Sequence, residues 1–367
     1  MLEFKLPSIG SDMDEGKLLE WKIKPGDRVR KGQVVAIVDT SKAAVDVEIW
    51  FDGTVHELLI EPGETIPVGT VLATLVAPGE KAGMPARPAP PAGRRKVSPA
   101  ARKHAEVLGV DVDTLAGSGP GGAVTLADVD TAAAQRSLVK PSAASDRQAE
   151  MRKAIAAAMS RSKREIPHYY LSEAIAMERA QAWLSEANAG RPITARLLMA
   201  ALQLKAVALA LQKYPEMNGF FRDGAFQPVA AAHIGVAISM RQGGLIAPAI
   251  HDVGEKSLDE VMRDLADLVK RARAGSLKSS EMSDPTITVT NLGEQGVEAV
   301  YGVIYPPQVA LVGFGRVTLR PWVDAGGLCV APVLMASLAA DHRVSDGHRG
   351  ALFLAELRDW LQQPEKL

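Results

Sequence analysis

The stretch P-G-D-R-V-R-K-G-Q-V-V-A-I-V at residues 25–38 returns as P-G-E-T-I-P-V-G-T-V-L-A-T-L at residues 62–75, an offset of 37 residues. Both copies consist of short β-branched runs separated by Gly, Pro and Asp, a pattern typical of strands joined by tight turns. Two copies are too few for a solenoid, which needs about three repeats or more. The repeat therefore predicts a small all-β sandwich with approximate two-fold symmetry over residues 1–76.

The length and composition predict a soluble chain of two or three domains. The chain has 367 residues, 47% of them hydrophobic, and a formal net charge of −1, which favours neither nucleic acid nor an anionic membrane as partner. The single cysteine, Cys329, excludes an internal disulfide and a cysteine-cluster metal site, and fits a reducing compartment. The sequence shows neither a signal-peptide pattern nor an uncharged apolar run of about 20 residues. We therefore expect a cytoplasmic location.

Two linkers divide the rest of the chain. Residues 77–93 are rich in Ala, Pro and Gly, so we expect an extended, semi-rigid tether with a reach of about 50 Å. A second, polar linker is expected at residues 135–147. Between them, residues 94–134 have the pattern of two short helices on either side of a Gly-rich loop at 117–122, which predicts a small α-helical domain.

Residues 148–367 form the largest predicted domain. Apolar residues at helical spacing predict helices, and β-branched runs predict strands. Because the two do not alternate strictly, they favour an α+β domain over a doubly wound parallel sheet. The expected helices are 149–164, 194–213 and 348–363, and the expected strands are 286–290, 308–314 and 330–339.

Lys42 lies in the segment D-T-S-K-A, at the junction of the two β halves. A turn lysine is usually only solvated, but at this symmetric junction it could present a prosthetic arm. Together with L-P-S-I-G-S-D-M-D-E-G at 6–16 and V-D-V at 45–47, the segment resembles the lipoyl domain family. This resemblance implies lipoate bound covalently to Lys42. Biotinyl domains share the fold but place Met on both sides of the lysine, where this chain has Ser41 and Ala43.

The loop G-S-G-P-G-G at 117–122 formally matches a dinucleotide-binding motif. That motif requires a preceding strand and a helix packed behind it, and the residues before this loop look helical, so we reject a nucleotide site. The segment V-S-P-A-A-R-K-H-A through G-P-G-G-A-V-T-L-A-D-V instead resembles the peripheral subunit-binding domain of 2-oxo acid dehydrogenase complexes. Ala123 stands where many family members have arginine, which leaves the identity of the docked partner open. A local basic cluster suits an acidic partner surface, although a merely solvated face is the alternative; it includes Arg94, Arg95, Arg102 and Lys103.

The segment D-H-R-V-S-D-G at 341–347 contains the candidate catalytic histidine. His342 and His348 are six residues apart and would not share a helical face as metal-binding histidines do, so we expect no metal. The segment resembles the H-x-x-x-D-G motif of dihydrolipoyl acyltransferases and chloramphenicol acetyltransferase. The resemblance spans nearly all of 148–367 and implies an α+β chloramphenicol-acetyltransferase-like domain. Four further segments support it: I-P-H-Y-Y at 166–170, G-L-I-A-P at 244–248, T-V-T-N-L-G at 288–293 and Y-P-P-Q at 305–308.

The resemblance also implies a role for each site residue. A thiol is mostly protonated at neutral pH, so His342 would accept the proton of coenzyme A as its sulfur attacks the acyl thioester. Thr290 holds the place of the family's hydroxyl donor to the oxyanion, and Asp346 would fix the backbone around the histidine. In this family the histidine and the hydroxyl come from different subunits of a trimer. Four residues resemble the segment that lines the coenzyme A channel, although they read equally well as a strand end: Gly244, Leu245, Ile246 and Pro248.

Together the three domains predict transfer of an acyl group, most simply acetyl, from S-acyl-dihydrolipoyl-lysine to coenzyme A in a 2-oxo acid dehydrogenase complex. M-D-E-G at 13–16 favours the pyruvate type, and acetoin-cleaving and branched-chain complexes are the alternatives. The implied partners are a thiamine-diphosphate-dependent 2-oxo acid decarboxylase, dihydrolipoamide dehydrogenase, and further copies in a homotrimer that builds a 24-mer or 60-mer. A non-catalytic lipoyl scaffold would not need His342, Thr290 and Asp346. A free-standing chloramphenicol-type acetyltransferase would leave the first 134 residues without a purpose.

Overall fold

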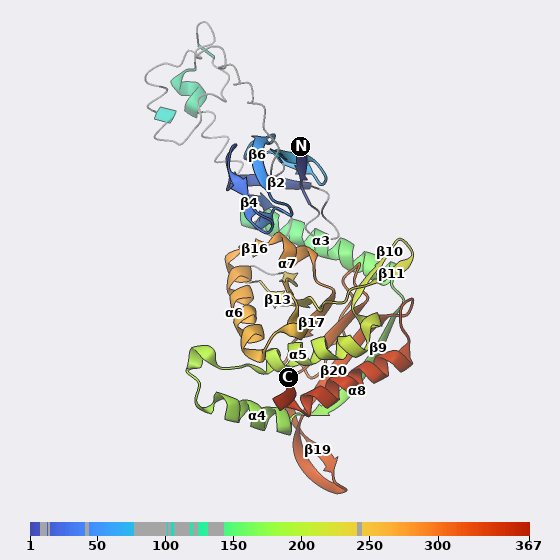
Figure 1. The fold of residues 1–367 in the computed structure, drawn as a ribbon. Coiled ribbons are helices and arrows are strands. Elements are labelled where there is room, and N and C mark those ends of the chain that lie inside the picture. Colours follow the sequence, from blue (N-terminus) through green and yellow to red (C-terminus); the bar gives the residue numbers. More distant parts are fainter. Residues whose placement is uncertain are drawn as a thin grey trace. The chain divides into compact units, whose positions relative to one another are not determined.

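The structure is a computed structural model, drawn in Figure 1. Lys42, Ala123, the basic residues Arg94, Arg95, Arg102 and Lys103, and most of residues 77–142 lie outside the described residues, so the interpretations that concern them stay predictions. The described residues are 1–7, 13, 15–40, 44–76, 101, 104–105, 118–119, 124–130, 143–240 and 244–367, without the side chains of 143–148 and 150.

The N-terminal domain is the predicted β-sandwich. One sheet carries β1-β8-β6-β3 in that order, and β5-β4-β2-β7 lie in order in the facing sheet, with every one of these pairs antiparallel. A shift of 37 residues carries β2, β3 and β4 onto β6, β7 and β8, so the two sheets are built from equivalent strands and each contains strands from both halves of the repeat. The strands are β1 (Leu2–Lys5), β2 (Glu15–Trp21), β3 (Arg28–Val29), β4 (Val34–Asp39), β5 (Ala44–Glu48), β6 (Gly53–Leu58), β7 (Thr65–Pro67) and β8 (Val71–Val76).

The turns and the core of this domain follow the same repeat. Gly26 and its equivalent Gly63 both have a positive φ, of 97° and 103°, a conformation that residues with a Cβ rarely adopt. β4 and β5, whose register pairs Asp39 with Ala44, flank the segment that contains Lys42. Equivalent apolar residues from the two halves meet in the core, among them Leu18, Val35, Val38, Val55, Leu72 and Leu75.

In the middle segment, residues 126–130 are helical, as predicted for the second short helix. The carboxylate of Asp128 accepts hydrogen bonds from the main-chain nitrogens of Ser118 and Thr125, both at 2.9 Å. These hydrogen bonds, led by that from Ser118, hold the pKa of Asp128 far below its usual value. A single carboxylate therefore ties the beginning of the Gly-rich loop to the start of the helix.

The C-terminal domain has the predicted α+β architecture. Its sheet runs β15-β12-β17-β18-β20, and β20 also pairs with β19 through its first half and with β9 through its second half. β12, β17 and β18 are parallel neighbours and the remaining pairs are antiparallel. The strands are β9 (His168–Ala176), β12 (Ile234–Val236), β15 (Ala249–Ile250), β17 (Ile287–Asn291), β18 (Ala310–Phe314), β19 (Thr318–Asp324) and β20 (Gly327–Asp341).

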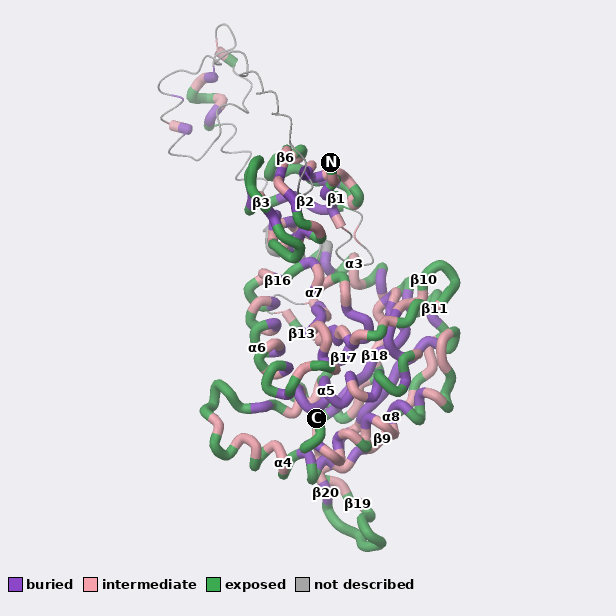
Figure 2. Tube along the Cα trace, in the orientation of Figure 1, coloured by how far each residue is buried: buried purple, intermediate pink, exposed green. Residues whose placement is uncertain are grey.

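Four short strands lie outside this sheet and pair locally: β10 (Gly219–Arg222), β11 (Ala225–Pro228), β13 (Ile238–Ser239) and β14 (Leu245–Ile246). A fifth short strand, β16 (Leu277–Lys278), directly precedes a short helix. β10 and β11 form a hairpin, and β13 pairs with β14. Figure 2 shows that the far end of the β19–β20 hairpin is exposed, whereas the central strands of the sheet are buried.

Helices pack on the sheet around one hydrophobic core, in which α5 packs against both α6 and α8, and α8 against β9. Figure 1 shows α5, α6 and α8 together on one side of the sheet. The helices of residues 143–367 are α3 (Ala143–Glu165), α4 (Glu178–Ala189), α5 (Met199–Lys213), α6 (Leu258–Ala274), α7 (Ser279–Ser283) and α8 (Gly347–Leu361), with 3-10 turns at Ile193–Ala195, Pro215–Met217, Val253–Glu255 and Pro364–Lys366.

Two predicted helices have different boundaries. α3 begins at Ala143, earlier than the expected 149 and inside the expected linker 135–147. The helix expected at 194–213 begins only at Met199. Asn188 explains the delay, because its side chain accepts a hydrogen bond from the Leu197 main-chain nitrogen (2.8 Å) and donates one to the Leu197 carbonyl (2.9 Å). These side-chain bonds satisfy the main chain of Leu197, which lies between the extended residues Arg196 and Leu198, and remove the need for helical partners.

The segment Ile193–Lys213 has the length and apolar composition of a membrane span. In this fold, however, α5 is a core helix with most of its residues buried among the other helices and the sheet. It even buries Lys205, whose ammonium group donates to the carbonyl oxygens of Gly254 (2.8 Å) and Lys256 (2.6 Å). Burial lowers the pKa of Lys205, and the carbonyls compensate by accepting its hydrogens.

Candidate active site

Thr290 lies on the wall of a cavity of about 590 Å³. Along β17, Ile287 and Val289 are buried in the core, whereas Thr288 and Thr290 face the cavity, because successive side chains of a strand point to opposite faces. The cavity walls are mostly apolar. A hydroxyl group is therefore presented in a sheltered, low-dielectric space, where a hydrogen-bond donor stabilises a developing negative charge more strongly than in water.

Val300 lies beside Thr290. Thr290 is paired with Gly313 of β18, and a Cβ at Gly313 would come within 2.9 Å of Val300 Cγ1 and 2.5 Å of the Val300 carbonyl oxygen. The Val300 carbonyl accepts a hydrogen bond from the Ser337 hydroxyl, which fixes the segment over the sheet. The Val300 side chain lines the cavity. It therefore limits the space next to the Thr290 hydroxyl.

Thr288 and Gln308 form a polar part of the cavity wall whose hydrogen bonds are satisfied internally. Thr288 donates to Gln308 Oε1 (2.7 Å), and Gln308 Nε2 donates to the Pro285 carbonyl (3.1 Å). Both residues are buried. The contact joins the segment before β17 to the Y-P-P-Q segment, and it leaves Thr290 as the hydroxyl available on β17.

The structure brings part of the predicted channel segment to the same cavity. Leu245 and Ile246 line it, and Leu245 is half exposed. Gly244 and Pro248 flank the lining residues. Gly244 has a φ of 93°, and a Cβ there would come within 2.1 Å of the Met151 sulfur, so only glycine fits against α3. The Pro248 carbonyl accepts a hydrogen bond from the Val236 main-chain nitrogen at 2.9 Å.

His342 lies in a tight turn directly after β20. The buried Asp341 carboxylate accepts hydrogen bonds from Arg343 through its main-chain nitrogen (2.9 Å), Nε (2.9 Å) and Nη2 (2.6 Å). The guanidinium group of Arg343 also lies 3.9 Å from the centre of the Phe221 ring. The His342 main-chain nitrogen donates to the Pro167 carbonyl (2.9 Å). Backbone and ion pair together hold the turn, and the His342 side chain projects outward and is exposed.

Tyr169 is the aromatic neighbour of His342. The two ring centres are 5.4 Å apart, and the ring planes meet at 74°. The Tyr169 hydroxyl shares a hydrogen bond of 2.8 Å with the hydroxyl of Ser345, which belongs to the same turn. Burial raises the pKa of Tyr169, so the hydroxyl stays protonated at neutral pH. Tyr169 therefore braces the turn that contains His342 against β9.

The histidine of the I-P-H-Y-Y segment, His168, has a structural role in the described residues. Its Nδ1 donates to the Ile166 carbonyl (2.8 Å), and its Nε2 accepts from the Ile304 main-chain nitrogen (3.1 Å). Burial lowers the pKa of His168, in agreement with this neutral form. The imidazole ties the start of β9 to the segment that lines the cavity near Gly302.

Asp346 caps α8. Its carboxylate accepts a hydrogen bond from the Arg349 main-chain nitrogen at 2.9 Å, and this bond is the main reason that the pKa of Asp346 lies below its usual value. The side chain is exposed and points to the helix terminus. This position agrees with the predicted role in fixing the backbone after His342.

The structure does not bring His342 to Thr290 within one chain. Thr290 pairs with Gly313, and Gly313 pairs with Ser337 of β20, which precedes His342 by five residues. Ordinary strand spacing and rise place the Cα atoms of Thr290 and His342 roughly 19 Å apart. A base must lie within hydrogen-bond reach of the reacting group. The two groups of one chain therefore cannot serve the same reaction centre.

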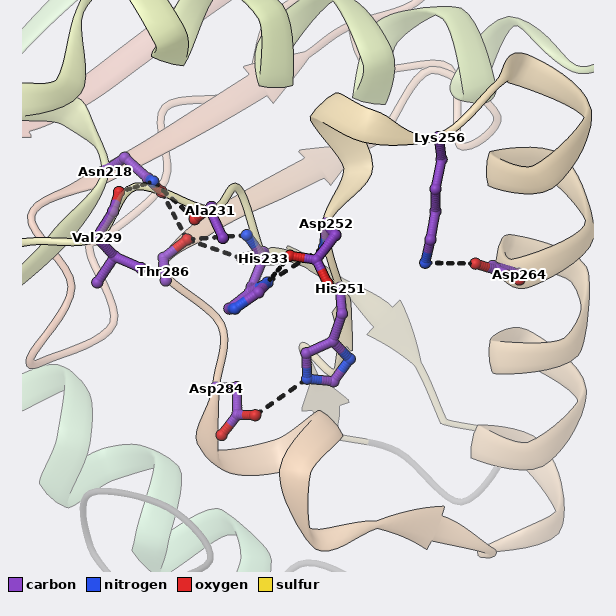
Figure 3. Close-up of polar contacts among 10 residues, drawn as sticks. All are labelled: Asn218, Val229, Ala231, His233, His251, Asp252, Lys256, Asp264, Asp284 and Thr286. Carbon is purple, nitrogen blue, oxygen red and sulfur yellow. Dashed lines mark hydrogen bonds and ion pairs between the residues drawn. The ribbon is translucent and has the colours of Figure 1, made fainter. Parts of the chain in front are cut away.

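A polar network fixes the start of β17 (Figure 3). The Thr286 hydroxyl bonds to the Asn218 side chain (2.5 Å), and the Thr286 main-chain nitrogen donates to the His233 carbonyl (2.8 Å). Asp252 donates its main-chain N–H to His233 Nδ1 (3.2 Å), so the His233 ring is neutral with its hydrogen on Nε2. The His251 ring lies 4.9 Å away and bonds to Asp284 at 3.0 Å. The network sets the register of the strand that presents Thr290.

We expect this network to make the stability of the C-terminal domain depend on pH. Burial, followed by the neighbouring His251, lowers the pKa of His233, with Asp252 and Asp284 acting against the shift and Lys256 reinforcing it. As the pH falls below about 6.5, the unfolded chain binds the proton before the folded chain does, so the free energy of unfolding decreases. The free energy of unfolding, measured with urea between pH 8 and pH 5, should decrease less for His233→Asn than for wild type. An equal decrease in both proteins would contradict the assignment of this pH dependence to His233.

Comparisons with known proteins agree with these features. The family model described as "2-oxoacid dehydrogenases acyltransferase (catalytic domain)" matches residues 142–367. "Biotin-requiring enzyme" matches residues 2–75, and "e3 binding domain" matches residues 95–130. A dihydrolipoyllysine-residue acetyltransferase component of the pyruvate dehydrogenase complex from Staphylococcus aureus is 31% identical, over 100% of this chain and 98% of that protein.

Two solved structures resemble the C-terminal domain. One is the dihydrolipoamide acetyltransferase of Azotobacter vinelandii, studied for the roles of a serine, a histidine and an asparagine in catalysis; it is 28% identical with a TM-score of 0.56, over 58% of this chain and 89% of that chain. The other is the cubic core of the pyruvate dehydrogenase multienzyme complex. It is 28% identical with a TM-score of 0.55, over 59% of this chain and 90% of that chain.

The fold and the matches define the class: a carrier domain of the biotin and lipoyl type and a docking domain precede a catalytic acyltransferase domain. The chain belongs to the 2-oxoacid dehydrogenase acyltransferase family, and it is an enzyme that transfers acyl groups.

Sequence reasoning missed several residues that shape the site. Tyr169 was quoted only as part of I-P-H-Y-Y and without a role, and Val300 gave no signal, because their neighbours come from distant parts of the chain. Thr288 could have been found from the alternation along its strand, which places it on the same face as Thr290. Arg161 and Arg222 also line the cavity, and they too were not singled out by any motif.

Proposed function

We propose that the chain transfers an acetyl group from S-acetyl-dihydrolipoyl-lysine to coenzyme A within a pyruvate dehydrogenase complex. The observation that carries the proposal is the hydroxyl of Thr290 on the wall of a largely apolar cavity, in a chain that also has an exposed histidine held by an ion-paired turn. The full-length similarity to an acetyltransferase component of pyruvate dehydrogenase supports the acetyl group and the parent complex.

The chemistry needs a base and an oxyanion donor. His342, in its neutral form, accepts the proton of the coenzyme A thiol while the sulfur attacks the thioester carbon. The carbonyl oxygen then carries the negative charge, and the Thr290 hydroxyl donates a hydrogen bond to it. When the intermediate collapses, the carbon–sulfur bond to dihydrolipoamide breaks, and the leaving thiolate takes the proton back from His342.

The spacing of the three residues supports these roles. In the Azotobacter vinelandii enzyme the serine, histidine and asparagine are separated by 52 and four residues. Thr290, His342 and Asp346 have the same two separations. Threonine keeps the hydroxyl of serine, and aspartate caps a helix as well as asparagine does. Both replacements keep the group that the proposed role requires.

The composite site follows from the separation of Thr290 and His342. Because the two lie roughly 19 Å apart along the sheet, a second copy has to supply the histidine to each Thr290 cavity. A closed ring of three copies, in which each chain gives a histidine to one neighbour and a cavity to the other, satisfies every site. The similarity to a cubic core supports assembly of such trimers into a larger symmetric core.

The N-terminal and middle domains serve delivery. Lys42 carries lipoate as a covalent arm, and the Ala/Pro-rich segment 77–93 raises the effective concentration of the acyl group at each site without tight binding. The match of residues 95–130 to an E3-binding domain supports docking of dihydrolipoamide dehydrogenase, with a thiamine-diphosphate-dependent decarboxylase as the source of the acyl group. We place the assembly in the cytoplasm.

An acyl-transfer assay tests the proposal without partner enzymes. Purified protein receives free dihydrolipoamide and, separately, acetyl-, succinyl- or isobutyryl-coenzyme A, so that the reaction runs in reverse. We expect acetyl transfer to be preferred. A clear preference for isobutyryl would move the chain to a branched-chain complex. If the assembled protein transfers none of the three groups, the chain is a carrier scaffold.

Val300→Ala is expected to change acyl preference. Removing two methyl groups beside Thr290 creates room for a branched acyl group, and one methylene in such a pocket changes discrimination by about tenfold or more. The ratio of kcat/KM for isobutyryl over acetyl transfer should therefore rise by at least about tenfold. Val303→Ala, at another lining position, is the matched control. An unchanged ratio in Val300→Ala would show that the acyl group lies elsewhere in the cavity.

A further inference from the structure

The cavity has an uneven charge. Among the described residues that line it, the charged side chains are two arginines, Arg161 on α3 and Arg222 at the end of β10. The other lining residues are neutral at pH 7, and most are apolar. Two cations without an acidic neighbour on the cavity wall favour a ligand with negative charge at this part of the cavity.

Arg222 is held in place on this wall. Its guanidinium carbon lies 4.2 Å from the centre of the Phe220 ring, and Phe220 also lines the cavity. Phe220 is bridged to Gln308, and the Phe221 main-chain nitrogen donates to the Pro307 carbonyl at 2.8 Å. The β10–β11 hairpin is thereby attached to the Y-P-P-Q segment, and stacking on an aromatic face orients the guanidinium plane.

Arg161 approaches from α3. Its Nε bonds to Glu165 one turn further along the helix at 3.0 Å, and the side chain is exposed. This pair on a solvated helix surface is weak and can exchange with another anion. Both arginines therefore lie on the cavity wall and are accessible to solvent. A binding site for a charged group that stays partly hydrated requires both properties.

Only one participant in the proposed reaction has a permanent multiple negative charge. Dihydrolipoamide and the acetyl group are neutral, whereas coenzyme A carries a diphosphate and a 3′-phosphate. We propose that Arg222, together with Arg161, binds the phosphate groups of coenzyme A and so directs its thiol towards Thr290. The proposal rests on the proposed function. Arginine suits this role because its planar group of donors matches phosphate oxygens.

The carboxylate of a succinyl group is the other anion that could meet these arginines. This carboxylate would belong to the acyl donor and not to coenzyme A. Substitution of the arginines would then weaken binding of the acyl donor, whereas a phosphate contact would weaken binding of coenzyme A. The apolar wall beside Thr290, including Val300 and Ile246, favours an uncharged acyl group there. We therefore assign the arginines to the phosphates.

The test compares three acyl acceptors with the assembled protein, with acetyl-dihydrolipoamide as donor: coenzyme A, dephospho-coenzyme A without the 3′-phosphate, and pantetheine without any phosphate. For Arg222→Gln we expect KM for coenzyme A to rise about tenfold with kcat within about twofold. Arg161→Gln should give a smaller rise, because its side chain is shared with Glu165. With pantetheine both variants should match wild type, which also shows that they fold and assemble. Arg273→Gln, an exposed arginine on α6 away from the cavity, is the control.

Several outcomes overturn the assignment. Equal KM values for coenzyme A in Arg222→Gln and wild type exclude a phosphate contact. The variants are also assayed with succinyl-dihydrolipoamide as donor, and a loss confined to succinyl transfer assigns the arginines to the acyl carboxylate. If the wild type transfers to none of the acceptors, the proposed function fails, and calorimetric titration with coenzyme A alone still decides the phosphate site: the Kd should rise about tenfold in Arg222→Gln. An unchanged Kd then overturns the assignment independently of turnover.

Discussion

His342→Ala is expected to lower acyl transfer by about 10²- to 10⁴-fold, because the variant has no base to accept the thiol proton. KM should change little, since the exposed imidazole is not part of the cavity wall. The reverse assay with acetyl-coenzyme A and free dihydrolipoamide measures the loss. His348→Ala, which removes an exposed histidine from the first turn of α8, serves as the control and should stay near wild type.

The same variant also tests the composite site. Thr290→Ala should lose about 10²- to 10³-fold in kcat through the missing oxyanion donor. When His342→Ala and Thr290→Ala chains are unfolded, mixed in equal amounts and refolded, about a quarter of the sites should combine an intact histidine with an intact threonine. Activity should return to about that fraction of wild type. If mixed trimers form, as shown by differently tagged chains, and activity stays at the level of the single variants, each site is built within one chain.

Lys42→Arg should abolish the activity of the reconstituted complex, because arginine keeps the charge but provides no amine that can form the amide bond to lipoate. The acyl-transfer step itself should be untouched, since free dihydrolipoamide replaces the arm in the assay. His342→Ala and Lys42→Arg thus separate catalysis from delivery. Intact-mass measurement of protein made with a lipoylating enzyme should show the lipoyl group on wild type and its absence on the variant.

Lys24→Arg is the matched control, because this lysine lies at a turn of the same domain and is exposed. It should be lipoylated and active. A lipoyl group found on Lys42→Arg protein would place the attachment site at another lysine. A modified wild type that carries biotin in place of lipoate would contradict the argument from Ser41 and Ala43.

Local patterns predicted the elements that carry most of the fold. The 37-residue repeat predicted the sandwich, and equivalent strands indeed lie in equivalent order in its two sheets. The C-terminal strands containing Thr290 and preceding His342 were found, because a buried strand depends on a continuous apolar run that the sequence displays directly. The predicted start of α5 was wrong. The true start depends on Asn188, whose side chain binds the main chain of Leu197, nine positions later.

From the sequence alone, the kinds of domain were predicted, and the family matches confirm them. The sequence also predicted the residue types that the proposed chemistry needs: Lys42, Thr290, His342 and Asp346. These depend on repeats, spacing and motifs, which are properties of neighbouring residues. Three features became visible only in the folded chain: Val300 lies beside Thr290, two arginines are the charged side chains among the described residues that line the cavity, and His342 is too far from Thr290 to act with it in one chain. Those facts depend on which strands are neighbours and in what register, and this pairing is set by the packing of the whole core.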